Sequence, residues 1–528
     1  MKPRRLSRLV AAFALALVTG RATLAVEARA RSAALASITT DDVTGHVNVL
    51  ADDTFEGREA GTRGNRAAAV YIVDRLKKFG LHGGGPGGSF YQTGNGSNNI
   101  LALVVGGEQA LKDQVILVGA HYDHVGYGTY RNSYGPIGRI HNGADDNASG
   151  VAALLEVAEA VNRLAEKPKR SILFAFWDGE EKGLLGSKYW IEHPTVPLDR
   201  VRLAINVDMI GRLRNSRVEV FGVRTAPGIR RLVSRQNDAA LRLDFNWDVR
   251  PDSDHYTFFS RNVPFLMLHT GRHDDYHRPS DDAEKINGDG LKQVAQLMFR
   301  VLVELADAPE LGGFRGRSRY ESRAAQRAAR VVLRPPPGRL GIRWDEAAAR
   351  NGNIVVTSVV PGSAADAAGL RPGDRLLKFA GREVNDENQF RIGVLAARNP
   401  VPVAVNRKGA DAPLEMTLEL AGKPVRLGIS WRTDVAEPRA VIVNRLTPGS
   451  PADLAGVRLG DRIYGICGRE FSGSDEFREL AATLPAPLIL EVETSGRVRT
   501  VELPSAGDED EVNAPHSNED AQSPDGED

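Results

Sequence analysis

The sequence predicts an α/β domain, a mostly parallel sheet between helices, followed by two copies of a smaller module. Between residues 37 and 309, short runs rich in Val, Ile and Leu alternate with stretches whose apolar residues recur at helical spacing. Runs that are apolar at successive positions suit strands covered on both faces, and their alternation with helices is typical of α/β domains. A motif repeated later in the chain predicts the duplicated module.

The composition is that of a soluble globular protein with more than one domain. The chain has 528 residues, which exceeds what one hydrophobic core usually organises. It is 42% hydrophobic and 26% charged with a net charge of zero, which gives no reason to expect binding to nucleic acid or to a membrane surface. Cys467 is the only cysteine, so an intramolecular disulfide is impossible.

The first residues predict export. A basic start is followed by an apolar stretch from Leu9 to Val18 and then by small residues. Because this stretch is too short to span a bilayer, residues 1–30 are predicted to be a cleaved signal peptide, with an uncleaved anchor as the alternative. We therefore expect an exported protein, periplasmic or secreted, with no stable membrane span after cleavage.

Residues 37–309 contain the expected elements of the α/β domain. Six apolar runs predict strands, and three longer stretches predict amphipathic helices. The strand runs are ILALVVG, QVILVGA, SILFAFW, RLAINVDM, VEVFGV and VPFLMLHT, and the helical stretches are GNRAAAVYIVDRLKKFGL, ASGVAALLEVAEAVNRLAEK and GLKQVAQLMFRVLVELAD.

The sequence changes character after this domain. Residues 310–338 are rich in Arg, Gly and Pro, which predicts a linker with one short helix and solvated arginines. Residues 505–528 contain almost no apolar side chains and are predicted to be disordered. Between them, a repeat predicts modules at 339–422 and 423–504. Its landmarks are LGI at Leu340 and Leu427, PGS at Pro361 and Pro448, and GDR at Gly373 and Gly460, at the same offset each time.

Acids and histidines gather where four of the predicted strands end. In open α/β sheets the carboxyl ends of the strands line one crevice, which is the usual ligand site. A fifth group lies in HNGADDNASG, a loop that enters a helix at the same edge. The five groups are His121, Asp123 and His124; Glu180 and Glu181; Asp208; His269, His273 and His277; and Asp145 with Asp146.

This mixture of imidazole and carboxylate suits hard or borderline divalent metals. Two metals a few ångströms apart need a shared carboxylate, because an acid that bridges them offsets their mutual repulsion. One member of the pair Asp145–Asp146 is expected to bridge in this way. The positive charge of the metals would then remove the repulsion between the adjacent carboxylates.

The same segments resemble the di-zinc exopeptidases, a family that includes secreted bacterial aminopeptidases, glutamate carboxypeptidase-like enzymes and glutaminyl cyclases. The resemblance covers roughly residues 40–308. It rests on seven motifs in order: GREAGTRGNRAAAVYI, HYDHVG, GADDNASGVAALLE, FWDGEEKGLLGS, NVDMIG, SDHYTF and YHRPSDD. It implies two Zn²⁺ ions, with Co²⁺ or Mn²⁺ as substitutes. The implied ligands are Asp145 as the bridge, His121 and Asp208 at one site, and Glu181 and His277 at the other.

The resemblance also implies roles around the metals. Glu180 is the expected general base, and Asp123 is expected to hydrogen-bond His121 and fix its tautomer. Asp146 matches a position that follows the bridging acid through a cis peptide bond. Arg58 lies in a matching segment and is expected to orient the edge of the site. Three further histidines are expected to be pocket-wall or structural groups: His124, His141 and His255.

The predicted function is hydrolysis of N-terminal peptide bonds in a peptide or protein substrate. A metal-bridging water would attack the scissile carbonyl, and Glu180 would take its proton and return it to the leaving amine. No Ser or Cys nucleophile is required. Carboxypeptidase or glutaminyl cyclase activity is the alternative, because Arg250 would suit a substrate carboxylate. An inactive peptidase whose repeats bind partners is a third hypothesis, and the complete ligand set argues against it.

The repeated signature PGSxADxAGxRxGDR resembles PDZ domains of exported bacterial proteases and so implies β-rich modules. In such domains the segment at LGI captures a peptide C-terminus by adding a strand. Peptide C-termini are therefore expected partners, and a packing module with a closed groove is the alternative. The residues that match the capturing loops are Leu340, Gly341, Ile342, Leu427, Gly428 and Ile429.

Overall fold

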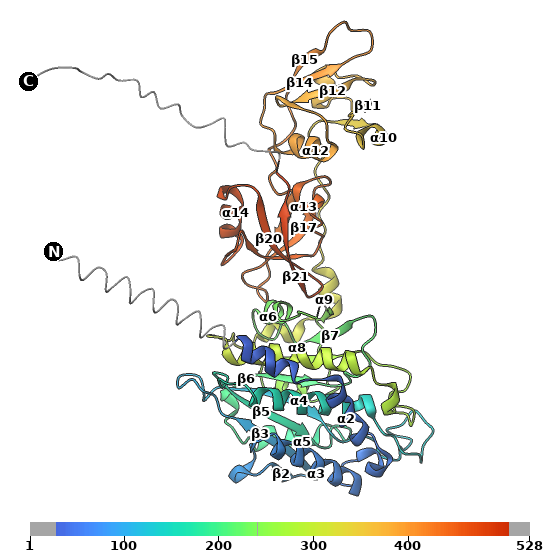
Figure 1. Cartoon of the computed structure of the whole chain (residues 1–528), viewed down its shortest axis with the longest axis vertical. Helices are drawn as coiled ribbons and strands as arrows, with labels where there is room; N and C mark the ends of the chain where they lie inside the picture. Colours follow the sequence, from blue (N-terminus) through green and yellow to red (C-terminus); the bar gives the residue numbers. More distant parts are fainter. Residues whose placement is uncertain (1–27, 240, 506–528) are drawn as a thin grey trace, which may run out of the picture. The chain divides into compact units, whose positions relative to one another are not determined.

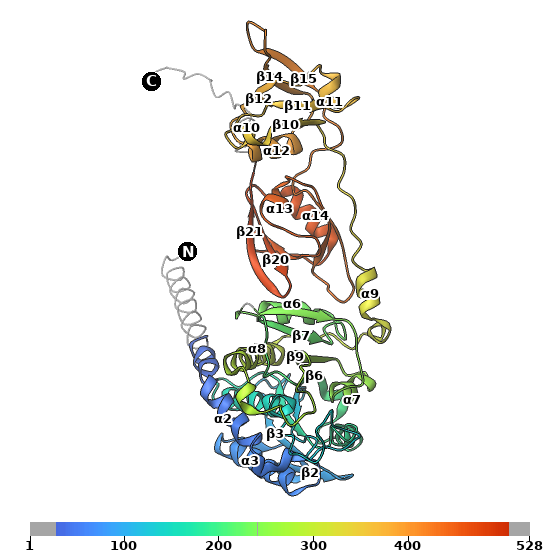
Figure 2. The ribbon, with the colours of Figure 1, turned by 90° about the vertical axis from the view of Figure 1, so that its right-hand side faces the viewer.

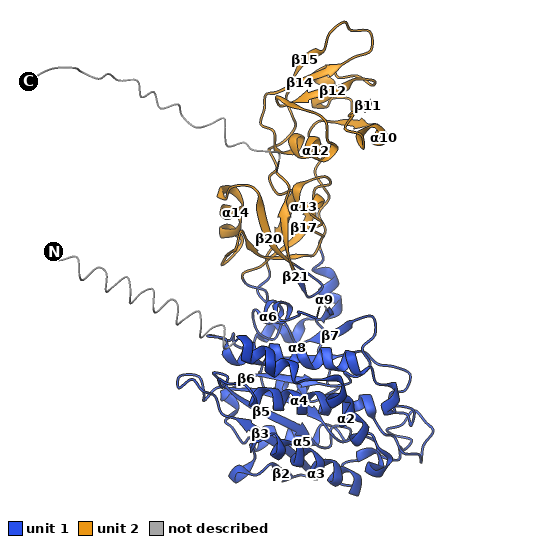
Figure 3. Ribbon diagram, viewed as in Figure 1, with its two compact units in different colours: residues 1–330, 434–438, 493–498 blue, residues 331–433, 439–492, 499–528 orange. Residues whose placement is uncertain are grey.

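The computed structural model describes residues 28–239 and 241–505, which form two compact units (Figures 1 and 3). The first unit runs to Arg330 and includes the segments Asp434–Pro438 and Glu493–Val498. The predicted signal peptide up to residue 27 and the predicted tail from residue 506 lie outside the described residues. Within the described part of the chain, no helix has both the length and the apolar character needed to cross a membrane.

The first unit is built on a nine-stranded mixed sheet with the order β1-β3-β5-β4-β6-β9-β7-β8 and β2 paired with β3. The central strands β5, β4, β6 and β9 are parallel, whereas β3 and β7 run antiparallel to their inner neighbours. The predicted α/β class is confirmed, with antiparallel pairing outside the parallel centre. The strands are β1 (His82–Gly83), β2 (Tyr91–Gly94), β3 (Ser97–Val104), β4 (Val115–His121), β5 (Ser171–Trp177), β6 (Val201–Val207), β7 (Arg217–Phe221), β8 (Arg242–Asn246) and β9 (Phe265–His269).

Helices cover both faces of this sheet. Along β5, Phe174 and Phe176 belong to one apolar cluster, and Ala175 and Trp177 belong to another. Helices α2, α3, α4, α6 and α8 contribute to the first cluster, and α5 and α7 to the second. Figure 2 shows α2 and α8 on one side of the strands and α7 on the other. The helices are α2 (Thr40–Leu50), α3 (Arg63–Lys78), α4 (Gly150–Asn162), α5 (Leu185–Glu192), α6 (Ile229–Arg235), α7 (His255–Ser260) and α8 (Gly288–Asp307).

The first part of the predicted linker belongs to the first unit. It contains the expected short helix, α9 (Arg323–Ala328). Before this helix, the side chain of Arg315 is only 10% exposed and pairs with Glu321 at 3.2 Å. The ring of Phe314 packs against that of Phe259, with centroids 5.7 Å apart. The expectation of solvated arginines is therefore wrong for Arg315, because a carboxylate compensates its burial.

The second unit contains two modules, as the repeat predicts, and each has a glycine with positive φ packed against a serine. Gly341 has φ +81° and Gly428 has φ +84°, and an added Cβ would lie 2.2 Å and 2.0 Å from Ser363 and Ser450 respectively. Both LGI segments therefore require glycine. The first module contains β10 (Ile342–Trp344), α10 (Glu346–Ala349), β11 (Val356–Val359), α11 (Ala364–Ala367), β12 (Arg375–Phe379), β13 (Arg382–Glu383), α12 (Glu387–Ala396), β14 (Val401–Asn406) and β15 (Leu414–Leu418). The second contains β16 (Ile429–Arg432), β17 (Val441–Leu446), α13 (Pro451–Leu454), β18 (Arg462–Ile466), β19 (Arg469–Glu470), α14 (Ser474–Thr483), β20 (Leu488–Thr494) and β21 (Arg497–Leu503).

Arg58 is a buried cation that joins the end of α2 to two loops at the carboxyl edge of the sheet. Its side chain is 1% exposed. It donates hydrogen bonds to the carbonyl oxygens of Leu50 (2.6 Å), Tyr122 (2.9 Å), Asn142 (2.6 Å) and Gly143 (3.0 Å). The loops that follow β4 and precede α4 are therefore held on one guanidinium group.

Replacing this guanidinium should destabilise the first unit. In Arg58→Met the four carbonyl groups lose their shared donor inside the protein, and we expect a loss of about 3 kcal/mol or more. Unfolding by denaturant, followed by tryptophan fluorescence, measures the effect. The matched control is Arg66→Met, an exposed arginine whose side chain, among the described residues, donates to the Gly61 carbonyl oxygen alone. Equal stability of the two variants would contradict the role of Arg58.

Candidate metal centre

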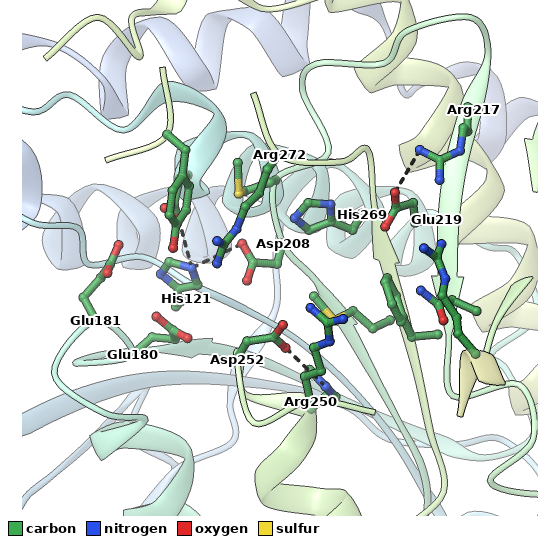
Figure 4. A pocket seen from close by; sticks show the side chains of 18 residues that line it. His121, Glu180, Glu181, Asp208, Arg217, Glu219, Arg250, Asp252, His269 and Arg272 are labelled. Carbon is green, nitrogen blue, oxygen red and sulfur yellow. Dashed lines mark ion pairs between the residues drawn. The ribbon is translucent and has the colours of Figure 1, made fainter. Parts of the chain in front are cut away.

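The carboxyl ends of the four central parallel strands carry the predicted groups to one edge of the sheet. His121 ends β4, and Asp208 directly follows β6. Glu180 and Glu181 follow β5, and the loop after β9 leads to His277. Figure 4 shows His121, Glu180, Glu181 and Asp208 around one pocket. The chemistry at this edge therefore comes from segments that are far apart in the sequence.

The potential ligands form two overlapping groups. In each group one donor atom per residue lies within 4.8 Å of the others. Asp146 belongs to both groups. The first group consists of His121, Asp146 and Asp208, and the second of His124, Asp146, Glu181 and His277.

The two carboxylate oxygens of Asp146 face different groups. Its Oδ1 lies 3.3 Å from Nε2 of His121, and its Oδ2 lies 3.2 Å from Nε2 of His277. Burial disfavours the charged carboxylate, but the hydrogen bonds with these two histidines hold its pKa well below the usual range. Asp146 therefore has the geometry and the charge state of a bridging ligand.

Asp145, which the sequence suggested as the bridge, lies in neither group. Its Oδ1 accepts a hydrogen bond from the Gly211 amide at 2.6 Å and from the Ser149 hydroxyl at 3.1 Å. Its Oδ2 lies 3.1 Å from Nε2 of His273. The geometry of a bridging ligand therefore belongs to Asp146, one residue after the predicted Asp145, because neighbouring donors already hydrogen-bond the Asp145 carboxylate. The non-proline cis peptide bond likewise joins Asp146 to Asn147, not Asp145 to Asp146.

Asp123 positions the two glutamates and does not primarily hold His121. Its Oδ1 accepts a hydrogen bond from the backbone amide of Glu180 at 3.0 Å, and its Oδ2 accepts one from that of Glu181 at 3.3 Å. The distance from Asp123 Oδ1 to Nδ1 of His121 is 3.7 Å, and the nearer contact of this ring nitrogen is the Asp123 carbonyl oxygen at 3.2 Å. The buried Asp123 therefore fixes the backbone from which both glutamates project.

Glu180 has the environment of a proton acceptor. Burial raises its pKa well above the usual glutamate value, His121 opposes this shift, and Glu181 adds to it. Glu181 differs, because hydrogen bonds from His124 and His277 outweigh burial and lower its pKa. The two neighbours are thus distinguished electrostatically. Glu181 is held as an anion, and Glu180 has a raised affinity for a proton.

The donor set fits divalent metal ions. Several buried atoms at this edge have no well-aligned hydrogen bond among the described residues, including Asp208 Oδ1, His277 Nε2 and His124 Nε2. An unpartnered buried polar atom is costly. Both histidines also lie near Asp146 Oδ2, His277 through Nε2 at 3.2 Å and His124 through Nδ1 at 3.8 Å. Imidazole nitrogens and carboxylate oxygens around one shared acid are what a pair of zinc ions requires.

The roles of two residues at this site were not predicted from the sequence. His124, expected to be a pocket-wall or structural group, lies 2.9 Å through Nδ1 from Glu181 Oε1 and belongs to the second group. Asp281 accepts hydrogen bonds through Oδ2 from the amides of Asp145 (2.9 Å) and Asp146 (3.1 Å). The motif YHRPSDD contains Asp281, but its spacing does not show which acid turns toward the loop before α4.

A cavity of about 370 Å³ adjoins the two groups (Figure 4). His121, Asp146 and Asp208 line it at the metal groups, and Glu180 and Glu181 lie beside them. His255 also lines this cavity. His141 does not, and its Nε2 forms a hydrogen bond with the Ser133 hydroxyl at 2.7 Å. The side chains of Arg250 and Asp252 also line the cavity.

Residues 99–302 match the model of peptidase family M28. This segment of the first unit is therefore similar to M28 peptidases and is called the M28 domain below. Residues 355–391 and 415–491 each match a PDZ domain, so two PDZ domains follow the M28 domain. The shared carboxylate Asp146 and the residues of both ligand groups lie within the matched segment.

Curated relatives of the M28 domain are peptidases. Leupeptin-inactivating enzyme 1 of Streptomyces exfoliatus is 29% identical over 46% of this chain and 50% of its own length. Aminopeptidase YwaD of Bacillus subtilis is 27% identical over 36% of this chain and 41% of its own length. The chain thus spans half or less of the length of these relatives. The LapA aminopeptidase structure of Legionella pneumophila aligns with 53% of this chain and 75% of its own, at 19% identity and a TM-score of 0.45.

Exchanging each aspartate of the pair should separate their roles. Asp146→Asn should sharply reduce the metal bound by the purified protein at both sites, because both groups lose a ligand. Asp145→Asn should retain most of the metal, since Asp145 contacts Gly211, Ser149 and His273 and neither ligand group includes it. Elemental analysis after dialysis measures the zinc-to-protein ratio. Greater metal loss in Asp145→Asn would assign the bridge to Asp145.

Proposed function

We propose that the M28 domain is a two-zinc aminopeptidase that removes N-terminal residues from peptides. The observation that carries this proposal is Asp146, whose two oxygens face the two ligand groups. We assign His121 and Asp208 to one ion, Glu181 and His277 to the other, and Asp146 to both. His124 lies close enough to the second group to ligate or to orient Glu181. The names of the curated relatives support the aminopeptidase assignment.

The reaction follows from the positions of these side chains. When bound, the two ions supply Lewis acidity toward the scissile carbonyl and lower the pKa of a shared water. Glu180 accepts the proton of the attacking water and returns it to the leaving amine, a contribution of roughly 10²–10⁴-fold in rate. Asp123 keeps Glu180 in place through the backbone amide.

The cavity offers a group for the free amine of the substrate. Asp252 lines it, is 49% exposed, and has its nearest ion contact at 4.0 Å, to His255. A carboxylate so weakly engaged is suited to bind an ammonium group beside Glu180. Arg250, which the sequence offered for a carboxypeptidase, lines the same cavity but is 69% exposed and lies 3.5 Å from Asp248. Asp252 therefore favours the aminopeptidase reaction.

The PDZ domains are proposed to bind peptide C-termini in at least the second module. Leu427, Gly428 and Ile429 line a cavity of about 970 Å³, together with Trp431, residues of α14 and, from the first module, residues of α12. A strand edge beside a helix matches capture by strand addition. Export to the periplasm or medium remains a prediction from the first residues of the sequence.

The two glutamates provide the decisive test of the proposed reaction. Glu180→Gln should keep near-normal zinc content and lose roughly 10²-fold or more in kcat on an aminoacyl reporter, because the proton acceptor is absent. Glu181→Gln should lose zinc from one site, because a ligand is weakened. Zinc analysis and steady-state kinetics on both variants measure these effects. Normal turnover by Glu180→Gln, or by wild type stripped of all metal, would contradict the mechanism.

Peptide binding by the second PDZ domain has its own test. A labelled peptide with a free C-terminal carboxylate should bind the full chain, and the same peptide as a C-terminal amide should bind much more weakly. Ile429→Lys should remove this difference, because it alters the strand edge of the cavity. Ile342→Lys makes the same change in the first module and serves as the matched control. Equal binding of acid and amide peptides would point to a closed packing module.

A further inference from the structure

The cavity beside the two ligand groups is rich in arginine. Apart from the proposed ligands and base, its lining contains two acids, Glu219 and Asp252. Against these stand four arginines, Arg217, Arg250, Arg272 and Arg323. An excess of guanidinium groups in a partly enclosed site raises the local concentration of anionic ligands and favours their binding.

Three of these arginines have acidic partners from the protein itself. Such pairs hold the guanidinium groups in place and neutralise part of their charge. The pairs are Arg217 with Glu219 at 2.8 Å and with Asp244 at 2.5 Å, Arg250 with Asp248 at 3.5 Å, and Arg323 with Asp244 at 3.8 Å.

Arg272 differs from the other three. Among the described residues it has no carboxylate partner, and its guanidinium group lies over the ring of Tyr276, 4.4 Å from the centroid. Its backbone is anchored, because its carbonyl oxygen accepts a hydrogen bond from Arg214 at 2.9 Å. Figure 4 shows its side chain reaching into the pocket near Asp208. A guanidinium group that stacks on an aromatic ring keeps its in-plane N–H donors available for a carboxylate.

His269 adds a neutral donor to the same part of the cavity. Its Nδ1 accepts a hydrogen bond from the Gly271 amide at 2.7 Å. In the neutral ring the proton therefore resides on Nε2. His269 and Arg272 both line the cavity, and the loop that follows β9 places them three residues apart. Together they present N–H groups from two different side chains.

We infer that Arg272, with His269 beside it, binds a carboxylate of the substrate and makes the enzyme selective for peptides that carry one next to the scissile bond. This inference rests on the proposed aminopeptidase function and specifies its substrate class. Two sources supply the same chemistry. They are the side chain of an acidic residue and the α-carboxylate of a short peptide.

Matched reporter substrates test the first source. A Glu reporter and a Gln reporter differ only in charge, and we expect kcat/KM to favour Glu by about tenfold in the wild type. Arg272→Glu should invert the charge preference, so that a Lys reporter is cleaved in preference to a Glu reporter. This inversion is a gain that a merely misfolded variant does not show. Arg131→Glu makes the same charge change on an exposed loop residue that does not line the cavity, and its Glu-to-Gln ratio should stay at the wild-type value.

A dipeptide with a free C-terminus, compared with its amide, tests the second source. A preference for the free dipeptide that Arg272→Glu abolishes assigns the carboxylate to the peptide terminus. Ratios near one for both comparisons, or unchanged ratios in Arg272→Glu, would overturn the inference. If the wild type cleaves neutral aminoacyl reporters but both charge comparisons give ratios near one, the inference is refuted and the proposed aminopeptidase function stands. A metal-loaded wild type that cleaves no reporter would refute both.

Discussion

The buried carboxylate of Asp146 is the constraint on which the site depends. A buried carboxylate is costly unless cations and hydrogen-bond donors surround it. His121 and His277 approach its two oxygens from opposite groups. Arg58 lies within the electrostatic reach of the same acid. Burial lowers the pKa of Arg58 to about 10, and Asp146 is the leading charge that opposes this shift. The position of these elements thus follows from the need to compensate one anion.

The backbone around Asp146 is held by side chains that have no role in the reaction. Asp281 accepts the amide hydrogen of Asp146, which fixes the start of the turn. Asn147 donates to the Val207 carbonyl oxygen at 3.0 Å, at the end of the strand that precedes Asp208. The shared acid and Asp208 are therefore linked through one amide side chain. Such preorganisation keeps ligand geometry fixed before any ion binds.

The sequence predicts the central strands well and the choice between neighbouring acids poorly. SILFAFW coincides with β5 because a continuous apolar run has no stable place except between two helical layers. The short strand β8 (Arg242–Asn246) escaped prediction, because its burial is interrupted and its runs are brief. Asp145 and Asp146 are indistinguishable by type and spacing. The Gly211 amide, distant in sequence, decides which of them turns away from the ligand groups.

The charge distribution of the cavity gives a short peptide a direction. The lining includes the carboxylates of Asp146, Glu180, Asp208 and Asp252 and the guanidinium groups of four arginines. A zwitterionic ligand in such a field has its lowest energy with the ammonium group toward the acids and a carboxylate toward the guanidinium groups. Bound cations would reduce the negative potential at the ligands but leave Asp252 and Arg272 in place. The peptide would then be oriented by protein side chains at both of its charges, and the scissile bond would lie between them, next to the proton acceptor.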